Sequence, residues 1–265
     1  MSEALNMRAL PPPWYDVSGD PANQEGPYVF TCEHATDNFG PQPIEAINRS
    51  LLGTHWAIDL GAAQLTRALA MKTNSSAVLS NYSRLLLDAN RCLTSETLFV
   101  DSIEGQALAC NRSLTAQERL YRIECLHAGY HAGIDAAIST RVARGPCTLV
   151  SIHSFTPVWK DVQRTVEIGV LFDAHEDLAH LVIEGLLKQG FDTRANEPYS
   201  GTTGELMYAA TEHGKKHQIP YIEFEVRQDL LSTQASVARV CGAIATALDD
   251  ATTRTGPRST PSNSV

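Results

Sequence analysis

The chain has 265 residues, of which 43% are hydrophobic and 19% charged, and this composition excludes a largely disordered protein. The net charge is −9 and no dense Lys/Arg block is present, so nucleic acid is not expected as a partner. No apolar run approaches the roughly 18 residues needed to span a bilayer, so we expect a soluble protein with no membrane partner.

Both ends of the chain have the composition of segments outside a packed core. Residues 1–26 are rich in Pro, Gly and Asn, which predicts an extended N-terminal arm on the surface. Residues 250–265 are rich in Thr, Ser and Pro, which predicts a disordered tail. A single catalytic domain is therefore expected over residues 27–249.

Within that domain, short β-rich runs alternate with helical patterns. This alternation predicts an α/β fold in which a mixed, mostly parallel sheet is flanked by helices on both faces. Ligands of such sheets gather at the carboxyl ends of the strands. We expect strands at 28–32, 77–79, 85–87, 148–152, 166–172 and 221–226, and helices at 58–72, 116–144, 176–190 and 233–248.

Several predicted strands end on side chains that can do chemistry. His34 follows the first strand, His153 ends the fourth, and the last strand carries Glu225. If these ends lie side by side, two histidines, several carboxylates and an arginine meet on one rim. Catalytic zinc is typically held by two imidazoles and one carboxylate, with one position left for water. The inventory therefore indicates a metal site.

The sequence offers two acids as the third ligand. Asp37 lies three residues after His34, so a strand end and the following turn could present both groups to one ion. Asp59, in the stretch HWAIDLGA, is the competing carboxylate. Because Asp59 precedes a predicted helix, it could equally be an ordinary N-terminal cap. The choice stays open at the level of sequence.

Seven segments, taken together, resemble a known enzyme family. They are CEHATDNFGP, HWAIDLGAAQL, YSRLLLDANR, SIHSFTPV, EIGVLFD, NEPYSG and IEFEVRQDL, and they cover nearly all of the chain from Phe30 to Leu230. This set resembles the N-formylglutamate amidohydrolase family, which is related to the zinc carboxypeptidase and aspartoacylase superfamily. The resemblance implies a zinc-peptidase type of fold and a metal-dependent hydrolase that cleaves an N-acyl amino acid. N-formyl-L-glutamate, cleaved to formate and L-glutamate, is the implied substrate.

The resemblance also implies roles for the metal ligands. His34 and His153 match the two metal-binding histidines, and the implied cofactor is Zn²⁺ or another divalent cation. Asp37 occupies the place of a ligand glutamate but is one methylene shorter, so Asp59 remains its competitor.

The implied partner is a small molecule with a carboxylate. Asn90 and Arg91 match the pair that holds this group, in keeping with the two parallel donors of a guanidinium. Arg84 is a second candidate for binding the substrate carboxylate, and Ser154 is a further candidate for substrate binding. The competing interpretation is that Arg91 forms a structural ion pair with Asp88.

Three further residues are implied in catalysis. Glu225 matches the general base that removes a proton from water and passes it to the leaving amine. Arg227 shares a strand face with Glu225 and could polarise the oxyanion. Tyr199, in the loop NEPYSG, could donate to the substrate. The alternative is that Glu225 and Arg227 only form a structural pair.

The remaining histidines carry weaker signals. His127 and His131 lie four residues apart on the long predicted helix, without the glutamate of an HExxH motif. We expect them on a helix face near the pocket, where their rings could orient a metal-ligand carboxylate. His213 and His217 are expected as surface or packing residues.

Other functions remain as alternatives. The sequence has no serine-hydrolase elbow, phosphate-binding loop or dinucleotide fingerprint. A non-catalytic protein that binds a carboxylated metabolite and a zinc carboxypeptidase for short peptides are both compatible with the same residues. Six scattered cysteines with no CxxC pair and no secretory signal ahead of them predict reduced thiols in the cytoplasm. The oligomeric state is left open.

Overall fold

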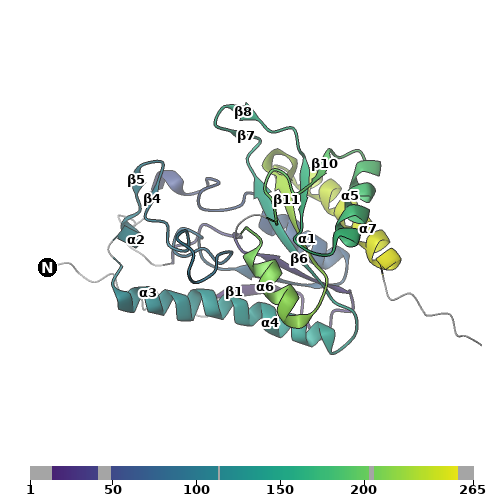
Figure 1. Cartoon of the computed structure of the whole chain (residues 1–265), viewed down its shortest axis with the longest axis horizontal. Helices are drawn as coiled ribbons and strands as arrows, with labels where there is room; N and C mark the ends of the chain where they lie inside the picture. The colour runs from purple at the N-terminus through teal and green to yellow at the C-terminus, as the bar shows by residue number, and fades with distance from the viewer. Residues whose placement is uncertain (1–13, 41–48, 113, 203–205, 256–265) are drawn as a thin grey trace, which may run out of the picture.

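A seven-stranded sheet forms the centre of the protein in a computed structural model, which describes residues 14–40, 49–112, 114–202 and 206–255 (Figure 1). The strand order is β1-β3-β2-β6-β11-β9-β10. Neighbouring strands are parallel except in the β1–β3 and β11–β9 pairs. The predicted mixed, mostly parallel sheet is thereby confirmed. The strands are β1 (Tyr15–Ser18), β2 (Tyr28–Cys32), β3 (Ser76–Ser80), β6 (Thr148–Phe155), β9 (Ile168–Leu171), β10 (Thr193–Ala195) and β11 (Tyr221–Arg227).

Helices cover both faces of the sheet. One face carries α1 (Ala62–Lys72), α5 (Glu176–Lys188) and α7 (Gln234–Thr255). The other carries α4 (Ala128–Val142) and α6 (Tyr208–His217), and α4 continues the line of α3 (Ala116–Arg122) through a π-helical turn, η4 (Ile123–His127) (Figure 1). No helix in the described ranges has both the length and the apolar character to cross a bilayer. The shorter elements are η3 (Arg49–Leu51), β4 (Ser102–Ile103), β5 (Gln106–Ala107), α2 (Ala109–Arg112), β7 (Val158–Trp159), β8 (Val162–Gln163) and η5 (Gln228–Leu231).

Side-chain alternation along β11 puts apolar residues and acids on opposite faces of the sheet. On β11, Ile222, Phe224 and Val226 pack into the core under α1, α5 and α7. Full burial of one such side chain contributes about 1.5–3 kcal/mol, so this face fixes the register of the strand. Because successive side chains alternate, Glu223 and Glu225 must point to the opposite face. The core packing of β11 thus aims two acids away from the core.

The strand predicted at 85–87 is wrong. Leu85, Leu86 and Leu87 are buried, but they lie in a turn and pair with no strand in the described chain. Two of their carbonyl groups are bonded by side chains instead. Asn111 donates to the carbonyl oxygen of Leu85, and Arg122 donates to that of Leu86, both at 2.8 Å. A short apolar run predicts burial, but it does not decide between a strand and a buried turn.

Both predicted chain-end boundaries need correction. Residues 15–18 form β1, which pairs antiparallel with β3 at the edge of the sheet, so part of the predicted arm belongs to the fold. Helix α7 continues past residue 249 to Thr255 because Ala251 is buried and the Tyr28 hydroxyl hydrogen-bonds Asp249 and Thr252. Of the predicted arm and tail, residues 1–13 and 256–265 lie outside the described residues.

The other predicted elements are present, with shifted ends. Strands predicted at 77–79, 148–152, 166–172 and 221–226 correspond to β3, β6, β9 and β11, and the four predicted helices correspond to α1, the α3–η4–α4 helix, α5 and α7. Helix α6 and strand β10 were not predicted. Both bear on the site described below, since α6 and the loop after β10 approach it.

Candidate active site

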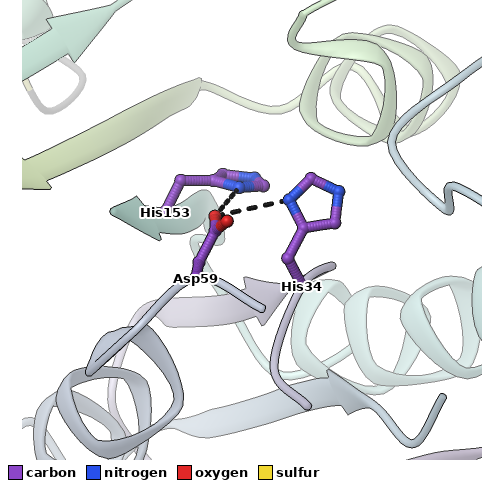
Figure 2. A group of neighbouring side chains, drawn as sticks. All are labelled: His34, Asp59 and His153. Atoms are coloured by element: carbon purple, nitrogen blue, oxygen red, sulfur yellow. Dashed lines mark hydrogen bonds and ion pairs between the residues drawn. The ribbon is translucent and has the colours of Figure 1, made fainter. Parts of the chain in front are cut away.

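Three residues that are far apart in the sequence meet beside the ends of β2 and β6. His34 follows β2, Asp59 precedes α1 and His153 lies near the end of β6. Asp59 Oδ2 is 2.8 Å from Nδ1 of His153 and 3.3 Å from Nδ1 of His34. Figure 2 shows both rings beside this carboxylate. All three side chains are buried, and their ligand atoms lie within 4.8 Å of one another, close enough to contact one cation.

The backbone around Asp59 holds its carboxylate in this position. The Asp59 N–H donates to the carbonyl oxygen of His34 at 3.0 Å, and the Ser154 N–H donates to Asp59 Oδ2 at 3.3 Å. The residue that caps α1 is Gly61, whose φ of 82° is in the left-handed region that glycine adopts readily. Asp59 is therefore not the cap of α1, and its carboxylate faces the two histidines instead.

Two outer carboxylates set the tautomers of the histidines. His34 Nε2 is 2.8 Å from Asp88 Oδ1, and His153 Nε2 is 3.0 Å from Glu33 Oε2. An ionised carboxylate only accepts, so each Nε2 carries the proton and donates it. In a neutral ring, Nδ1 is then an unprotonated electron-pair donor directed at Asp59. Metal-binding histidines are oriented by carboxylates in this way, so the residues present fit a divalent cation of the zinc class.

The charges around the cluster also favour a bound cation. Burial lowers the pKa of His153, but Glu223, Asp59 and Glu33 outweigh burial and hold this pKa well above its usual range. Burial raises the pKa of Glu33, but hydrogen bonds from His153 and Ser151 lower it to about 2. The surroundings therefore favour added positive charge. The acids of the cluster and its neighbourhood are Glu33, Asp59, Asp88, Glu223 and Glu225, and the guanidinium groups are Arg84 and Arg91.

Glu225 is the buried acid that faces the pocket without a partner. It lies opposite His153 in the β11–β6 register, and its Oε2 accepts no hydrogen bond in the described structure. Burial raises the pKa of Glu225 well above its usual range; His153 opposes this shift and Asp59 adds to it. Glu223 points to the same face two residues earlier, and burial raises its pKa to about 7. Of the two, only Glu225 lines the pocket.

The two arginines of the site have different surroundings. Arg84 donates to Asp88 Oδ2 at 2.7 Å, lies 3.1 Å from His34 Nδ1 and is 3.6 Å from Asp59 Oδ1. It is therefore occupied by the acids of the cluster. Arg91 donates to the Thr97 hydroxyl and to the carbonyl oxygen of Asn90, and no acid in the described ranges forms a salt bridge with it. The structural pair considered for Arg91 and Asp88 is made by Arg84 instead.

Asn90 and Ser154 use their polar side-chain atoms in hydrogen bonds within the protein. Asn90 Nδ2 donates to the carbonyl oxygen of Leu206 at 2.6 Å, and its Oδ1 accepts from the Ala209 N–H at 2.9 Å. Asn90 thus ties the segment that carries Arg91 to the start of α6. The Ser154 hydroxyl donates to the carbonyl oxygen of Leu60 at 2.9 Å, next to Asp59. Both residues line the pocket and support its geometry.

Two of the predicted site residues lie away from the cluster. Asp37 Oδ2 accepts from the Gly53 N–H at 2.8 Å and does not line the pocket. Arg227 pairs with Asp229 at 2.7 Å and donates to the carbonyl oxygens of residues 164–166. It shares a strand face with Glu225, but β11 ends at Arg227 and the guanidinium turns to the neighbouring loop. The structural pair between Glu225 and Arg227 is not formed either.

A pocket of about 350 Å³ opens over the cluster. Its floor is polar, and its wall is aromatic, with His55, Trp56 and Trp159 in mutual ring contact. Tyr199 also lines it, and Arg164 donates to the Tyr199 hydroxyl at 3.3 Å. Concave sites with apolar walls and few convergent polar groups are typical of small-molecule pockets. Sequence reasoning predicted Tyr199 but missed His55, Trp56, Trp159 and Arg164, because these residues lie in turns and a short hairpin with no strand-end signal.

Comparison with known proteins gives matches that cover all residues of the site. A family model described as N-formylglutamate amidohydrolase matches residues 26–232. A gene product of Agrobacterium tumefaciens with a solved structure is 27% identical, with a TM-score of 0.83 over 91% of this chain and 95% of its own. An N-formylglutamate amidohydrolase from Ralstonia eutropha is 17% identical, with a TM-score of 0.66 over 91% and 98% of the two chains, which shows a shared fold. The search of curated proteins gave no match.

Proposed function

Because the chain belongs to the N-formylglutamate amidohydrolase family, we propose that it is a metal-dependent enzyme that hydrolyses N-formyl-L-glutamate to formate and L-glutamate. Family membership makes it an amidohydrolase, and the proposal adds the substrate and the cation. One observation carries the proposal: a buried cluster of two histidines and an aspartate shares a pocket with Glu225, whose Oε2 accepts no hydrogen bond from the described residues.

His34, Asp59 and His153 would hold the cation, and zinc is the cation that we propose for this ligand set. When bound, a zinc ion polarises the amide carbonyl of the substrate and lowers the pKa of a water molecule toward about 7. Glu33 and Asp88 keep the two imidazoles in the tautomer that leaves Nδ1 available. Arg84 balances the charge of Asp59 and Asp88, so that these acids remain ionised in a buried site.

Glu225 would move the proton during the reaction. It accepts a proton from the water whose oxygen attacks the formyl carbon, and it then donates this proton to the amine nitrogen as the C–N bond breaks. Formate and the free amine of glutamate are the products. Burial, which raises the pKa of Glu225, makes its carboxylate a stronger base than an exposed glutamate. Its unpartnered Oε2 leaves this group available for both transfers.

Arg91 would bind a carboxylate of the substrate. Its guanidinium lines the pocket and is not engaged by an acid in the described chain, so it can offer two parallel donors. Tyr199, supported by Arg164, provides a second polar group at the pocket wall. Trp56 and Trp159 would cover the apolar part of the substrate and exclude water from the reacting bond.

Metal removal tests the proposal as a whole. We expect purified protein loaded with zinc to release formate from N-formyl-L-glutamate, a chelator to abolish this release, and added zinc to restore it. Metal content measured by elemental analysis should fall and rise in parallel with turnover. Full activity after complete metal removal would contradict the proposed mechanism.

A substrate panel separates the competing functions. Turnover of short peptides in preference to the formyl substrate would indicate a carboxypeptidase. Metal-loaded protein that binds glutamate without cleaving any N-acyl amino acid would indicate a binding protein.

The Arg91→Met variant tests carboxylate recognition. A charge-assisted hydrogen bond contributes about 1.5–3 kcal/mol, so kcat/KM for the formyl substrate should fall roughly 10- to 150-fold, mainly through KM. The zinc content should stay unchanged because Arg91 makes no contact with the cluster. Arg239→Met, on the far helix α7, serves as the matched control and should retain wild-type values. An unchanged KM in Arg91→Met would assign the carboxylate to another group.

A further inference from the structure

Helices α4 and α6 pack together (Figure 1). They carry a second group of metal-ligating side chains, none of which lines the pocket. Asp135 comes from α4, and His213 and His217 lie four residues apart on α6, so the two rings share one helix face. Asp135 Oδ1 is 2.9 Å from Nδ1 of His213 and 2.8 Å from Nε2 of His217. The three ligand atoms lie within 4.8 Å of one another. One ion could therefore contact all three.

A partly buried histidine of α4, His131, fixes the tautomer of a neutral His213. His131 Nε2 is 3.0 Å from the carbonyl oxygen of Ala89, which can only accept, so Nε2 carries the proton. Because Nε2 is used for this bond, Nδ1 is the nitrogen of a neutral His131 ring that can accept a hydrogen bond. His213 Nε2 is 2.8 Å from that Nδ1 and must donate to it.

The consequence is an unprotonated nitrogen that faces a carboxylate. A neutral His213 that donates through Nε2 has a lone pair on Nδ1, and this lone pair points at Asp135 Oδ1. Two acceptors 2.9 Å apart repel unless a positive charge lies between them. This arrangement repeats what the outer carboxylates impose on His34 and His153.

We propose that Asp135, His213 and His217 form a second binding site, for a divalent transition-metal cation of the zinc class. Two imidazoles and one carboxylate are a usual protein ligand set for zinc, and His217 is only partly buried, so water can complete the shell. Bond lengths of about 2.0–2.2 Å place tetrahedral ligand atoms roughly 3.3 Å apart, so the two distances from Asp135 to the histidines need to open by only about half an ångström. His217 can move its ring proton to Nδ1 and present Nε2.

Two neighbours bear on this site. His131 would orient the ligand His213 by accepting from Nε2, and through Ala89 it reaches the segment between Asp88 and Asn90. Lys216 donates to the other oxygen of Asp135 at 2.6 Å and opposes a cation by charge. Because Lys216 occupies Oδ2, Oδ1 stays available to the ion, with the ammonium as a competing charge beside it.

Cobalt(II) titration of metal-free protein tests the site without depending on activity. Equilibrium dialysis gives the stoichiometry, and the visible absorption of histidine-bound cobalt reports the ligand set. We expect wild type to bind one equivalent more than His217→Ala or Asp135→Asn. His180→Ala, which removes an exposed histidine of α5, should match wild type. Asp59→Ala removes the active-site cluster instead and should retain the equivalent held at the second site.

Lys216→Met tests the same site without removing a ligand. Loss of the competing ammonium should tighten cobalt binding at this site by about fivefold or more, since a charge at this distance opposes the ion by about 1 kcal/mol even in water. Equal stoichiometry and affinity in wild type, His217→Ala and Asp135→Asn would overturn the proposal, as would an unchanged affinity in Lys216→Met. The result is independent of formate release, so it stands or falls separately from the proposed reaction.

Discussion

Replacing Glu225 with glutamine should lower kcat by about 10²- to 10⁴-fold while KM changes little. Positioned proton transfer contributes a factor of this size, and the amide of glutamine cannot accept the proton of the attacking water. The substitution keeps the shape of a buried side chain that makes no hydrogen bond through Oε2, so the fold should be retained. Steady-state formate release at saturating N-formyl-L-glutamate gives the measurement.

Glu223→Gln is the comparison for this variant. Glu223 is equally buried on the same strand face, but it does not line the pocket, and its pKa near 7 means that a neutral side chain is already accessible there. The loss of kcat should therefore be much smaller than for Glu225→Gln. Equal losses in both variants would indicate that the two acids act on the electrostatics of the cluster and that Glu225 has no separate role in proton transfer.

Asp59→Ala and Asp37→Ala should give opposite results. Asp59 faces both imidazoles, so its removal should weaken zinc binding by at least about 10²-fold and abolish turnover, because even a supporting residue of a metal ligand is worth 10- to 100-fold. Among the described residues, Asp37 accepts from the Gly53 N–H and lies outside the pocket, so its removal should leave zinc content and kcat close to wild type. Zinc affinity from competition with a chromogenic chelator provides the test. Loss of metal in Asp37→Ala with retention in Asp59→Ala would reverse the ligand assignment.

The fold was largely predictable because its strands are buried and its helices amphipathic. The runs at 28–32 and 221–226 are long enough and rich enough in β-branched and aromatic residues to indicate strands, and the structure confirms both. The run at 85–87 has the same apolar character but lies in a turn, because Asn111 and Arg122 satisfy its carbonyl groups. Such long-range side-chain contacts leave no local pattern.

The residue types of the site were predictable from the sequence, but the contacts that these residues make with one another were less so. Strand ends pointed to His34, His153 and Glu225, since parallel strands bring their carboxyl ends to one edge. Spacing favoured neither Asp37 nor Asp59, and only the turn into α1 brings Asp59 between the rings.

The sequence also did not show which of the arginines pairs with which acid. Both Arg84 and Arg91 lie in the stretch that the sequence singled out, but whether Asp88 engages the first or the second depends on the turn between them. Arg227 shares the alternation of Glu225, yet the end of β11 directs it to Asp229.

The supports of the two imidazoles are crossed between distant parts of the chain. Glu33, next to His34, holds the ring of His153, while Asp88 from another segment holds His34. No ligand is thus prepared by its own neighbourhood, and a half-assembled chain would present at most fragments of the cluster. Tight capture of an ion would then be restricted to molecules that have completed their tertiary structure. A bound ion would then stabilise the folded chain at a late stage of folding, and it would slow amide hydrogen exchange in all the segments that it joins.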